Sequence, residues 1–452
     1  MIRTLLLVLC WVFVCTIGSY GQTKVLTFEE AVKLGLKNGM LINQQKNTLE
    51  YNQMQYYSNI AGLGPTLNAG ASANRVQGNT FNSNLGKVVN GLFDQVTGSL
   101  NANLNIFNGF AQVNKVRQGN ALVNAQAFYV NRTAQDIINT IAGQYLTVLL
   151  DFELLTIARE NSVAQRKQLE QVTEQVNVGS KSPVDQYNQE SQTKAAEIKE
   201  LQAEITFVND KALLALTLLI NPEEEFGVEK PAWDVNAIDV NKTELPALLE
   251  TSLKNRGDYL RAVKNEDAAR FGMKMMKGYM TPTLSVYGTL YSAYNYDHTA
   301  TTNAPFDEQF KTSNYKKYYG IQLNIPILGG QQALQVRTNY IQQKVNYLNA
   351  QLTRKNAEIT VKSDVVRAYQ NYQLYAKTYT LTVDQLKAAD TAFGLETERY
   401  NLGITTFVDY SNANKVFVQA QTDKAQAEYR LLFQKVLVDY AAGTLKPEAI
   451  EE

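Results

Sequence analysis

Two short segments of this 452-residue chain carry the same acidic pattern. Each has a glycine followed six residues later by an aspartate: Gly179 and Asp185 in the first segment, Gly403 and Asp409 in the second. A glycine in the left-handed conformation ends a helix readily, and a carboxylate in the first turn of the next helix complements its dipole. The spacing therefore predicts two helix–turn–helix connections, each with one carboxylate beside the turn.

Residues that could carry catalysis are scarce. The single histidine, His298, lies in a polar Tyr-Asp-His-Thr segment, and both cysteines, Cys10 and Cys15, lie in the first 21 residues. Basic and acidic residues balance at 43 each, which gives no reason to expect nucleic-acid binding. Neither a phosphate-binding loop nor a nucleophile elbow occurs. We therefore expect no catalytic residue, no metal site and no cofactor.

The N-terminal residues 1–21 predict a signal peptide. Arg3 precedes an apolar run from Leu5 to Ile17, which ends in the small-residue segment Gly18-Ser19-Tyr20-Gly21. This run is shorter than the ~20 apolar residues that span a bilayer comfortably. A retained N-terminal anchor is the alternative.

The glycine–aspartate pairs belong to a longer internal repeat. Gly403 follows Gly179 by 224 residues, and Pro65-Thr66-Leu67 recurs as Pro282-Thr283-Leu284 after 217 residues. Two unrelated landmarks at nearly equal offsets indicate a duplicated ancestral half.

Each half predicts long helices around its glycine–aspartate turn. Apart from one proline beside the first turn, 110–220 and 331–441 contain no proline, which would break a helix interior. Apolar residues recur there at helical spacing, so we expect two long helical hairpins that pack as coiled coils. An earlier helix is expected over 27–60, where Thr27 and Glu30 have capping-box spacing.

Four short segments alternate between apolar and polar residues, which predicts strands. They form one pair in each half: 66–75 with 98–107, and 283–294 with 318–327. Strands of this length can cross a bilayer when tilted, and their asparagine-rich faces suit a water-filled channel. A soluble four-stranded sheet packed on helices is the alternative.

Four strands cannot close a barrel in lipid, because open sheet edges leave backbone groups unpaired. The chain must therefore assemble with copies of itself. Two copies would supply eight strands and three would supply twelve. The strand pattern by itself does not choose between them.

Motifs along nearly the whole mature chain resemble the TolC family of outer-membrane efflux channels. They include both glycine–aspartate turns and both Pro-Thr-Leu strand starts. The other motifs are Leu26-Thr27-Phe28-Glu29-Glu30-Ala31-Val32, Asn255-Arg256-Gly257-Asp258-Tyr259-Leu260 and Pro326-Ile327-Leu328-Gly329-Gly330. The resemblance implies an α+β membrane protein, a homotrimer with a 12-stranded β-barrel (four strands per chain) continuous with a long α-helical periplasmic barrel.

The resemblance also implies a domain order. A first repeat would occupy 22–220, an equatorial segment 221–255, a second repeat 256–441 and a C-terminal tail 442–452. Such a protein would be the outer-membrane channel of a tripartite efflux or type I secretion system. Its partners would be outer-membrane lipid, a periplasmic adaptor (membrane fusion protein) and an inner-membrane transporter of the RND or ABC type. A periplasmic coiled-coil scaffold without a pore is the alternative.

Candidate site residues follow from the resemblance as well. Asp185 and Asp409 would ring the constricted periplasmic mouth of the pore, attracting cations. The adaptor would dock on the two turns, at Val178, Gly179, Ser180, Leu402, Gly403 and Ile404. Thr405 stands where the family often has a basic residue, and Asn412 where an acidic residue would be expected. We therefore expect a closing lock that is weaker or built from other residues.

Overall fold

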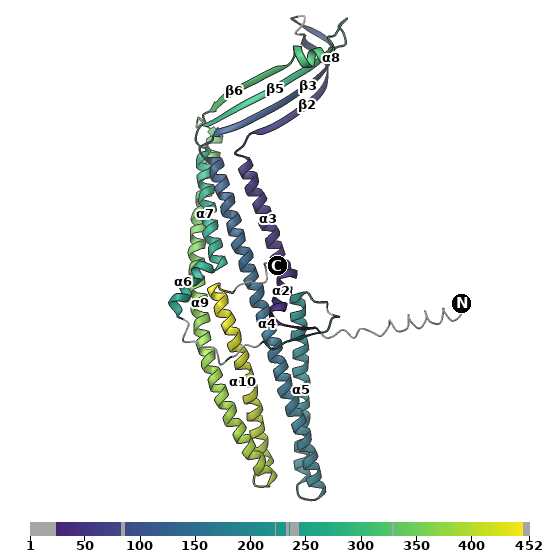
Figure 1. Cartoon of the computed structure of the whole chain (residues 1–452), viewed down its shortest axis with the longest axis vertical. Helices are drawn as coiled ribbons and strands as arrows, with labels where there is room; N and C mark the ends of the chain where they lie inside the picture. Colours follow the sequence, from purple (N-terminus) through teal and green to yellow (C-terminus); the bar gives the residue numbers. More distant parts are fainter. Residues whose placement is uncertain are drawn as a thin grey trace, which may run out of the picture. The chain divides into compact units, whose positions relative to one another are not determined.

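The computed structural model describes residues 24–82, 86–221, 223–231, 235, 244–327 and 330–445 (Figure 1). The expected signal peptide, 1–21, and residues 446–452 of the expected tail lie outside them. The chain divides into two compact units. The turn unit comprises Met1–Gln44, Asn131–Arg256 and Thr360–Glu452, and the sheet unit comprises Gln45–Val130 and Gly257–Ile359.

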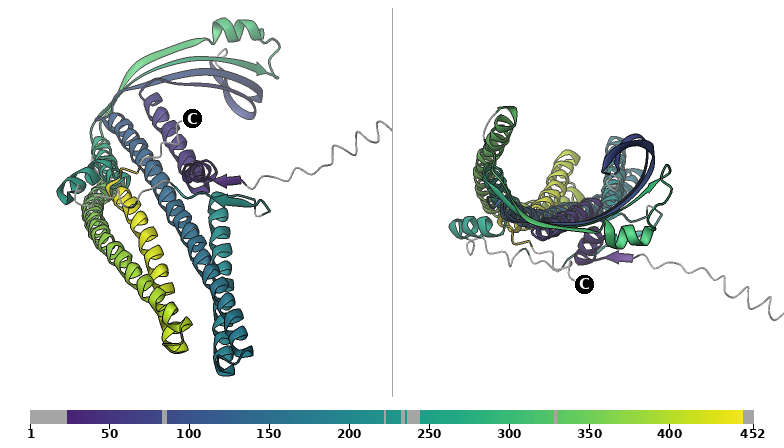
Figure 2. Two further views of the ribbon diagram at one scale, coloured as in Figure 1. Left: turned by 60° about the horizontal axis from the view of Figure 1, so that its bottom comes forward. Right: turned by 90° about the horizontal axis from the view of Figure 1, so that it is seen from above.

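Four antiparallel strands form the core of the sheet unit. They pair in the order β2–β3–β5–β6, so a strand from each half meets at the centre of a strongly curved sheet (Figure 2). The strands are β2 (Thr66–Asn82), β3 (Lys87–Phe107), β5 (Thr283–Asp297) and β6 (Lys316–Asn324). The unit also contains α3 (Met40–Ala61), α7 (Gly257–Gly278), α8 (Phe306–Glu308) and the π-helix η3 (Gln309–Ser313).

The first strand pair is longer than expected, because the polar segment 76–96 is largely strand and not loop. Alternation continues through it, and Val76 pairs with Phe93 across the two strands. Gly86 follows the end of β2 with φ +63°, a conformation that suits a hairpin turn. Cross-strand pairing thus outweighs the polar composition of this segment.

The second strand pair also differs from the expected bounds. β5 extends past residue 294 to Asp297, and β6 ends at Asn324 and not at 327. Pro326 explains the earlier end, because proline cannot donate a backbone hydrogen bond to a sheet.

The two faces of the sheet differ in polarity. On the polar face, Asn68, Asn101 and Thr289 lie in one row, and the Thr289 hydroxyl donates to Asn101 Oδ1 over 2.9 Å. The opposite, apolar face carries exposed aliphatic side chains at Leu67, Leu100, Leu290, Ile321 and Leu323. One face therefore suits water and the other suits an apolar environment.

Glycine makes the passage from β3 into the following helix possible. Gly109 has φ +63°, and a Cβ atom there would lie 1.9 Å from Thr281 Oγ1 and 2.4 Å from the carbonyl oxygen of Gly278. No other residue fits this position, since both the backbone angle and the space exclude a side chain.

Segments of four long helices dominate the turn unit, arranged as two antiparallel hairpins (Figure 1). The helices are α4 (Ala111–Asn177) with α5 (Pro183–Leu218), and α9 (Gly330–Asn401) with α10 (Phe407–Ala442). One 18-residue window of α4 reaches a mean hydropathy of 1.4, which by length and composition alone is enough to cross a membrane, and 44 % of that window is buried within the chain.

A small belt connects distant parts of the turn unit. β1 (Lys24–Leu26) pairs in parallel with β4 (Phe226–Val228). The buried Tyr145 hydroxyl lies 2.8 Å from the Leu26 carbonyl oxygen and 2.6 Å from that of Glu229. The helices of the belt are α2 (Phe28–Asn38) and α6 (Leu245–Asn255).

The helix expected over 27–60 is in fact two helices. The capping box between Thr27 and Glu30 opens α2, but Gly39 leaves the helical conformation with φ −53° and ψ 117° and separates α2 from α3. A Cβ at Gly39 would lie 2.6 Å from the Gly35 carbonyl oxygen, so glycine is also required for space.

Candidate functional site at the two helical turns

The first turn connects α4 to α5 and is closed by local hydrogen bonds. Gly179 has φ +77°, and the Ser180 amide donates to the Gln175 carbonyl oxygen over 2.8 Å. Ser182 is the N-cap of α5, and its hydroxyl accepts from the Val184 amide. Asp185 completes a capping box by accepting from the Ser182 amide, so its carboxylate is held at the helix start.

The second turn has the same design with different residues. Gly403 has φ +73°, and the Ile404 amide donates to the Arg399 carbonyl oxygen over 2.8 Å. Asp409 Oδ2 accepts hydrogen bonds from the hydroxyls of Thr406, at 2.6 Å, and of Thr405, at 3.3 Å. The bond from Thr406, supported by that from Thr405, lowers the pKa of the exposed Asp409 carboxyl below its usual value.

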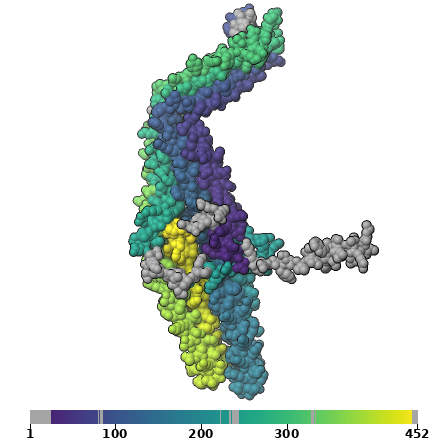
Figure 3. Space-filling model, viewed as in Figure 1, coloured from purple at the N-terminus to yellow at the C-terminus, as the bar shows by residue number. Residues whose placement is uncertain are grey.

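Apolar side chains project from both turns into solvent. Val178 is 80 % exposed, Leu402 74 % and Ile404 64 %. Nothing lies within 4 Å of a Cβ built on Gly179 or Gly403, so these glycines are needed for their backbone angles and not for space. The two hairpin tips lie side by side at one end of the turn unit (Figure 3).

A contact that the sequence analysis missed connects the two turns. Lys181 Nζ lies 3.5 Å from the ring centre of Tyr400, the last aromatic residue of α9 before its turn. Burial lowers the pKa of Lys181, and the Asp185 carboxylate opposes that shift. Burial also raises the pKa of Tyr400 to about 12, helped by the charge of Asp185.

A signal for this contact was present in the sequence. Thr405 lies two positions after Gly403 and carries no charge, but Lys181 occupies the same position after Gly179. The basic residue is therefore present in the other turn. Asn412 is exposed on α10.

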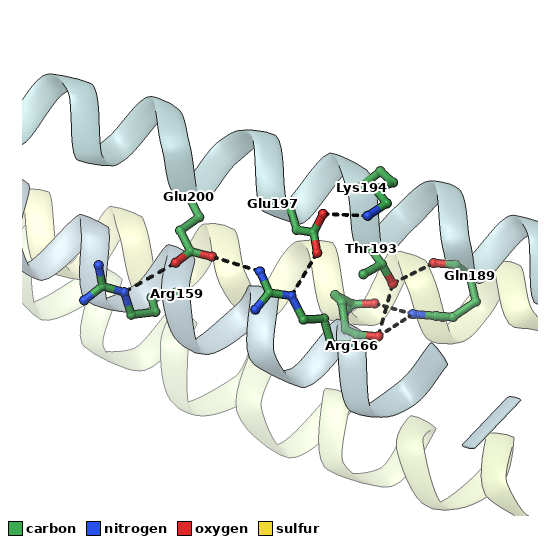
Figure 4. Close-up of polar contacts among 8 residues, drawn as sticks. Arg159, Arg166, Gln189, Thr193, Lys194, Glu197 and Glu200 are labelled. Atoms are coloured by element: carbon green, nitrogen blue, oxygen red, sulfur yellow. Dashed lines mark hydrogen bonds and ion pairs between the residues drawn. The ribbon is translucent and has the colours of Figure 1, made fainter. Parts of the chain in front are cut away.

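A buried polar layer fixes the α4–α5 hairpin near its turn (Figure 4). Gln189 Nε2 donates to Gln165 Oε1 over 2.8 Å, and the Thr193 hydroxyl donates to the Gln165 carbonyl oxygen over 3.1 Å. Gln189 is fully buried. Because an unpaired buried amide is costly, the two helices are held in the register that preserves these bonds.

Ion pairs flank this layer on the exposed side of the hairpin. Arg166 Nε lies 2.8 Å from Glu197 Oε1, and Arg159 Nε lies 3.4 Å from Glu200 Oε1 (Figure 4). Exposed pairs of this kind contribute about 0–1 kcal/mol each, so the buried amides set the register more strongly than the charges do.

Aromatic rings replace the polar layer in the α9–α10 hairpin. The ring of Tyr400 stacks on Tyr410 at 4.8 Å, and Phe393 stacks on Phe417 at 5.2 Å. The buried Tyr400 hydroxyl makes no hydrogen bond among the described residues. Within this hairpin the aromatic contacts place Tyr400 where Lys181 can reach it.

The described residues contain no group of three or more His, Cys, Asp or Glu side chains that could hold a metal ion. Asp185 and Asp409 each cap their own helix, and neither a hydrogen bond nor an ion pair joins them within the described parts of the chain. The described side chains at the turns can therefore act through the charge of their carboxylates and through their apolar surface.

Comparison with known proteins gives a consistent picture. The model of the family "Outer membrane efflux protein" matches residues 34–221 and 248–444. Outer membrane protein TolC of Salmonella enteritidis is 25 % identical over 327 residues, which cover 70 % of this chain and 62 % of that protein. The match thus spans somewhat less than two thirds of that relative.

Solved structures show the same fold at low identity. The outer membrane protein VceC of Vibrio cholerae aligns with a TM-score of 0.79 at 15 % identity, covering 92 % of this chain and 96 % of VceC. The CmeC outer membrane channel of Campylobacter jejuni aligns with a TM-score of 0.79 at 16 % identity, covering 92 % of this chain and 85 % of CmeC.

Proposed function

The chain belongs to the outer membrane efflux protein family, and we propose that it is the outer-membrane channel of a tripartite efflux or type I secretion system. Family membership places it in the outer membrane with an extension into the periplasm. It acts as a passive exit duct for substrates that an inner-membrane transporter, of the RND or ABC type, delivers through a periplasmic adaptor. The observation that carries this proposal is the four-stranded sheet with one polar and one exposed apolar face.

A homotrimer completes the barrel. β2 and β6 lie at the edges of the sheet, and unpaired backbone groups in lipid cost several kcal/mol each. Three copies of the chain supply twelve strands, enough to surround a water-filled lumen lined by the asparagine-rich face. The apolar face then contacts lipid.

Unpartnered helical faces support the same assembly. Ile198, Leu201, Ile205 and Val208 of α5 are 55–61 % exposed and follow the alternating three- and four-residue spacing of a coiled-coil seam. Exposed stripes of this kind require a partner helix, and further copies of the chain provide it.

The two turns form the periplasmic mouth and the docking surface in this proposal. Three copies of Asp185 and Asp409 give six carboxylates, which attract cations and repel anions. The exposed Val178, Leu402 and Ile404 at the tips present apolar side chains to the adaptor.

Reconstitution tests the proposal directly. The mature protein should purify from the outer-membrane fraction as a trimer that dissociates on heating, and it should give single-channel currents in a planar bilayer. A freely soluble monomer without conductance would contradict the channel and favour a periplasmic coiled-coil scaffold.

A further inference from the structure

An apolar groove lies on the sheet unit beside the segment between β5 and β6. Its volume is about 430 Å³, and its walls include Leu100 and Leu290 from the strands and Phe310 and Tyr315 from the connecting segment. Lys311 lines the same groove. The groove thus combines an apolar interior with a cation.

Strand register places this groove on the apolar face of the sheet. Leu100 pairs directly with Leu290, and both belong to the row of exposed aliphatic residues. α8, which continues into η3, lies on the convex side of the curved sheet (Figure 2). In the proposed barrel, the groove therefore opens toward lipid and not toward the lumen.

The segment that forms the outer wall is fixed by specific contacts. The Phe310 ring lies 3.0 Å from the position of a Cβ atom on Gly98, so the absence of a side chain there allows η3 to approach the sheet. Asn314 Nδ2 donates to the Ala293 carbonyl oxygen over 2.8 Å, and the Ser292 hydroxyl donates to the Phe310 carbonyl oxygen. These contacts hold the wall of the groove in place on the apolar face.

Lys311 lines the groove, and Lys317 lies next to two of its lining residues, Leu290 and Tyr315. Lys317 pairs with Leu290 across the strands, and its Nζ atom lies 5.4 Å from the ring centre of Tyr315. Lys311 Nζ is 3.1 Å from Asp307, but both side chains are about 70 % exposed. An exposed ion pair is weak, so Lys311 is available to a stronger anion such as a phosphate.

We propose that this groove binds a phosphorylated lipid of the lipid A type, with an acyl chain against Leu100, Leu290 and Phe310 and a phosphate between Lys311 and Lys317. The inference rests on the proposed barrel, because only there does the apolar face meet lipid. An outer-leaflet glycolipid is the occupant that fits, because the groove lies beside the segment that connects β5 to β6. In the proposed barrel, this connecting segment faces away from the periplasm. Aromatic and basic residues of this kind gather where a barrel meets lipid headgroups.

Native mass spectrometry of the detergent-purified trimer tests the site, with hexa-acylated bis-phosphoryl lipid A as the probe. The wild-type trimer should retain lipid A. The double variant Lys311→Ala, Lys317→Ala should retain it less strongly, by roughly fivefold for each lysine removed, because this is the contribution of one basic residue near an anionic membrane surface. Lys316→Ala is the matched control, because Lys316 pairs with Tyr291 on the opposite face and should leave retention unchanged.

Two further measurements separate the parts of the proposal. Leu100→Trp places a larger side chain on the groove floor and should reduce retention while leaving both lysines intact. Retention of lipid A that lacks its phosphates should not depend on Lys311 and Lys317. Equal retention by wild type and the double lysine variant, or equal retention of phosphatidylglycerol, would overturn the site. Trimer formation and conductance, measured on the same samples, report failure of the channel proposal separately.

Discussion

The ammonium group of Lys181 lies 3.5 Å above the ring of Tyr400 and joins the two helical turns of the chain. A cation over an aromatic face contributes about 0.5–2 kcal/mol, depending on how far the pair is removed from water. Because each residue belongs to a different hairpin, any separation of the hairpin tips breaks this contact. We infer that it holds the proposed periplasmic mouth closed.

Replacement of Lys181 should therefore favour the open mouth. Lys181→Met keeps the length of the side chain but removes the charge, so the open state should gain roughly 2- to 30-fold in relative population, as the contact energy implies. Single-channel conductance and open probability in a planar bilayer measure this. Lys194→Met is the control, because Lys194 pairs only with Glu197 on the same helix in the described contacts.

Variants of Tyr400 should separate its ring from its hydroxyl. Tyr400→Phe keeps the aromatic face and removes a buried hydroxyl that has no described hydrogen-bond partner, so gating should stay the same and thermal stability should not fall. Tyr400→Leu removes the aromatic face and should behave as Lys181→Met does. Equal open probability for the Phe and Leu variants would rule out the ring as the partner.

The two turn glycines should be intolerant of alanine for a backbone reason alone. Gly179→Ala and Gly403→Ala place a side chain at φ of +77° and +73°, which costs about 1–2 kcal/mol each although the space is open. Denaturant unfolding of the purified protein measures the loss. Gly394→Ala is the matched control, since this open position lies inside α9, where alanine should stabilise the helix by roughly 0.5–1 kcal/mol.

Cation block of the proposed pore should depend on the pKa of Asp409. Asp409→Ala should weaken block of the single-channel current by divalent cations, because half of the proposed carboxylate ring is lost. The Thr406 hydroxyl lowers the pKa of Asp409, so the wild-type charge is lost only as pH falls below the usual range for aspartate.

Thr406→Val should therefore shift the loss of block to higher pH. Removing the hydroxyl raises the pKa of Asp409, and the carboxylate becomes protonated earlier on acidification. Thr397→Val is the control, because the Thr397 hydroxyl donates only to the Phe393 carbonyl oxygen within α9 in the described contacts. If cation block depends on pH in the same way in wild type, Thr406→Val and Thr397→Val, Asp409 does not lie in the pore.

A buried carboxyl group beside a second, half-buried one should make the turn unit more stable in acid. Burial, together with the neighbouring Asp210, raises the pKa of Asp151 on α4 to about 7. Because the folded pKa lies above the unfolded value, the protonated form is favoured by folding, and stability should fall as pH rises from about 4 to 7.

Asp151→Asn should abolish this slope, since asparagine mimics the neutral acid at every pH. The free energy of unfolding, measured from pH 4 to 8, should then be larger than that of wild type at the alkaline end. Asp384→Asn on the exposed surface of α9 should retain the wild-type slope. A pH slope that survives in Asp151→Asn would assign it to other groups.

Local rules were sufficient to predict the elements that begin with strong sequence signals. The positive φ angles of Gly179 and Gly403 follow from their place between a long helix and a capped one, and β2 and β5 begin at the two Pro-Thr-Leu segments as expected. Each of these features depends on residues within one turn or one strand, so the sequence nearby contains the information.

Features that depend on distant partners could not be predicted in this way. The contact of Lys181 with Tyr400 requires knowledge of which hairpin lies beside which, and Asp151 sits in an apolar helical pattern that hides its partner Asp210. The first strand pair was expected only over 66–75 and 98–107, but pairing with the partner strand continues through the polar segment between them, as Val76 with Phe93 shows. Each of these features depends on residues that are far apart in the sequence and adjacent in the fold.

The alternating directions of the four strands have a consequence for closure of the proposed barrel. Each neighbouring pair in the order β2–β3–β5–β6 is antiparallel, so the two outermost strands of one chain also point in opposite directions. When β6 of one copy meets β2 of the next, that seam is antiparallel like every other pairing. Because each chain contributes an even number of strands, identical chains can join with antiparallel pairing at every junction. An odd number of strands would place two parallel strands at each junction.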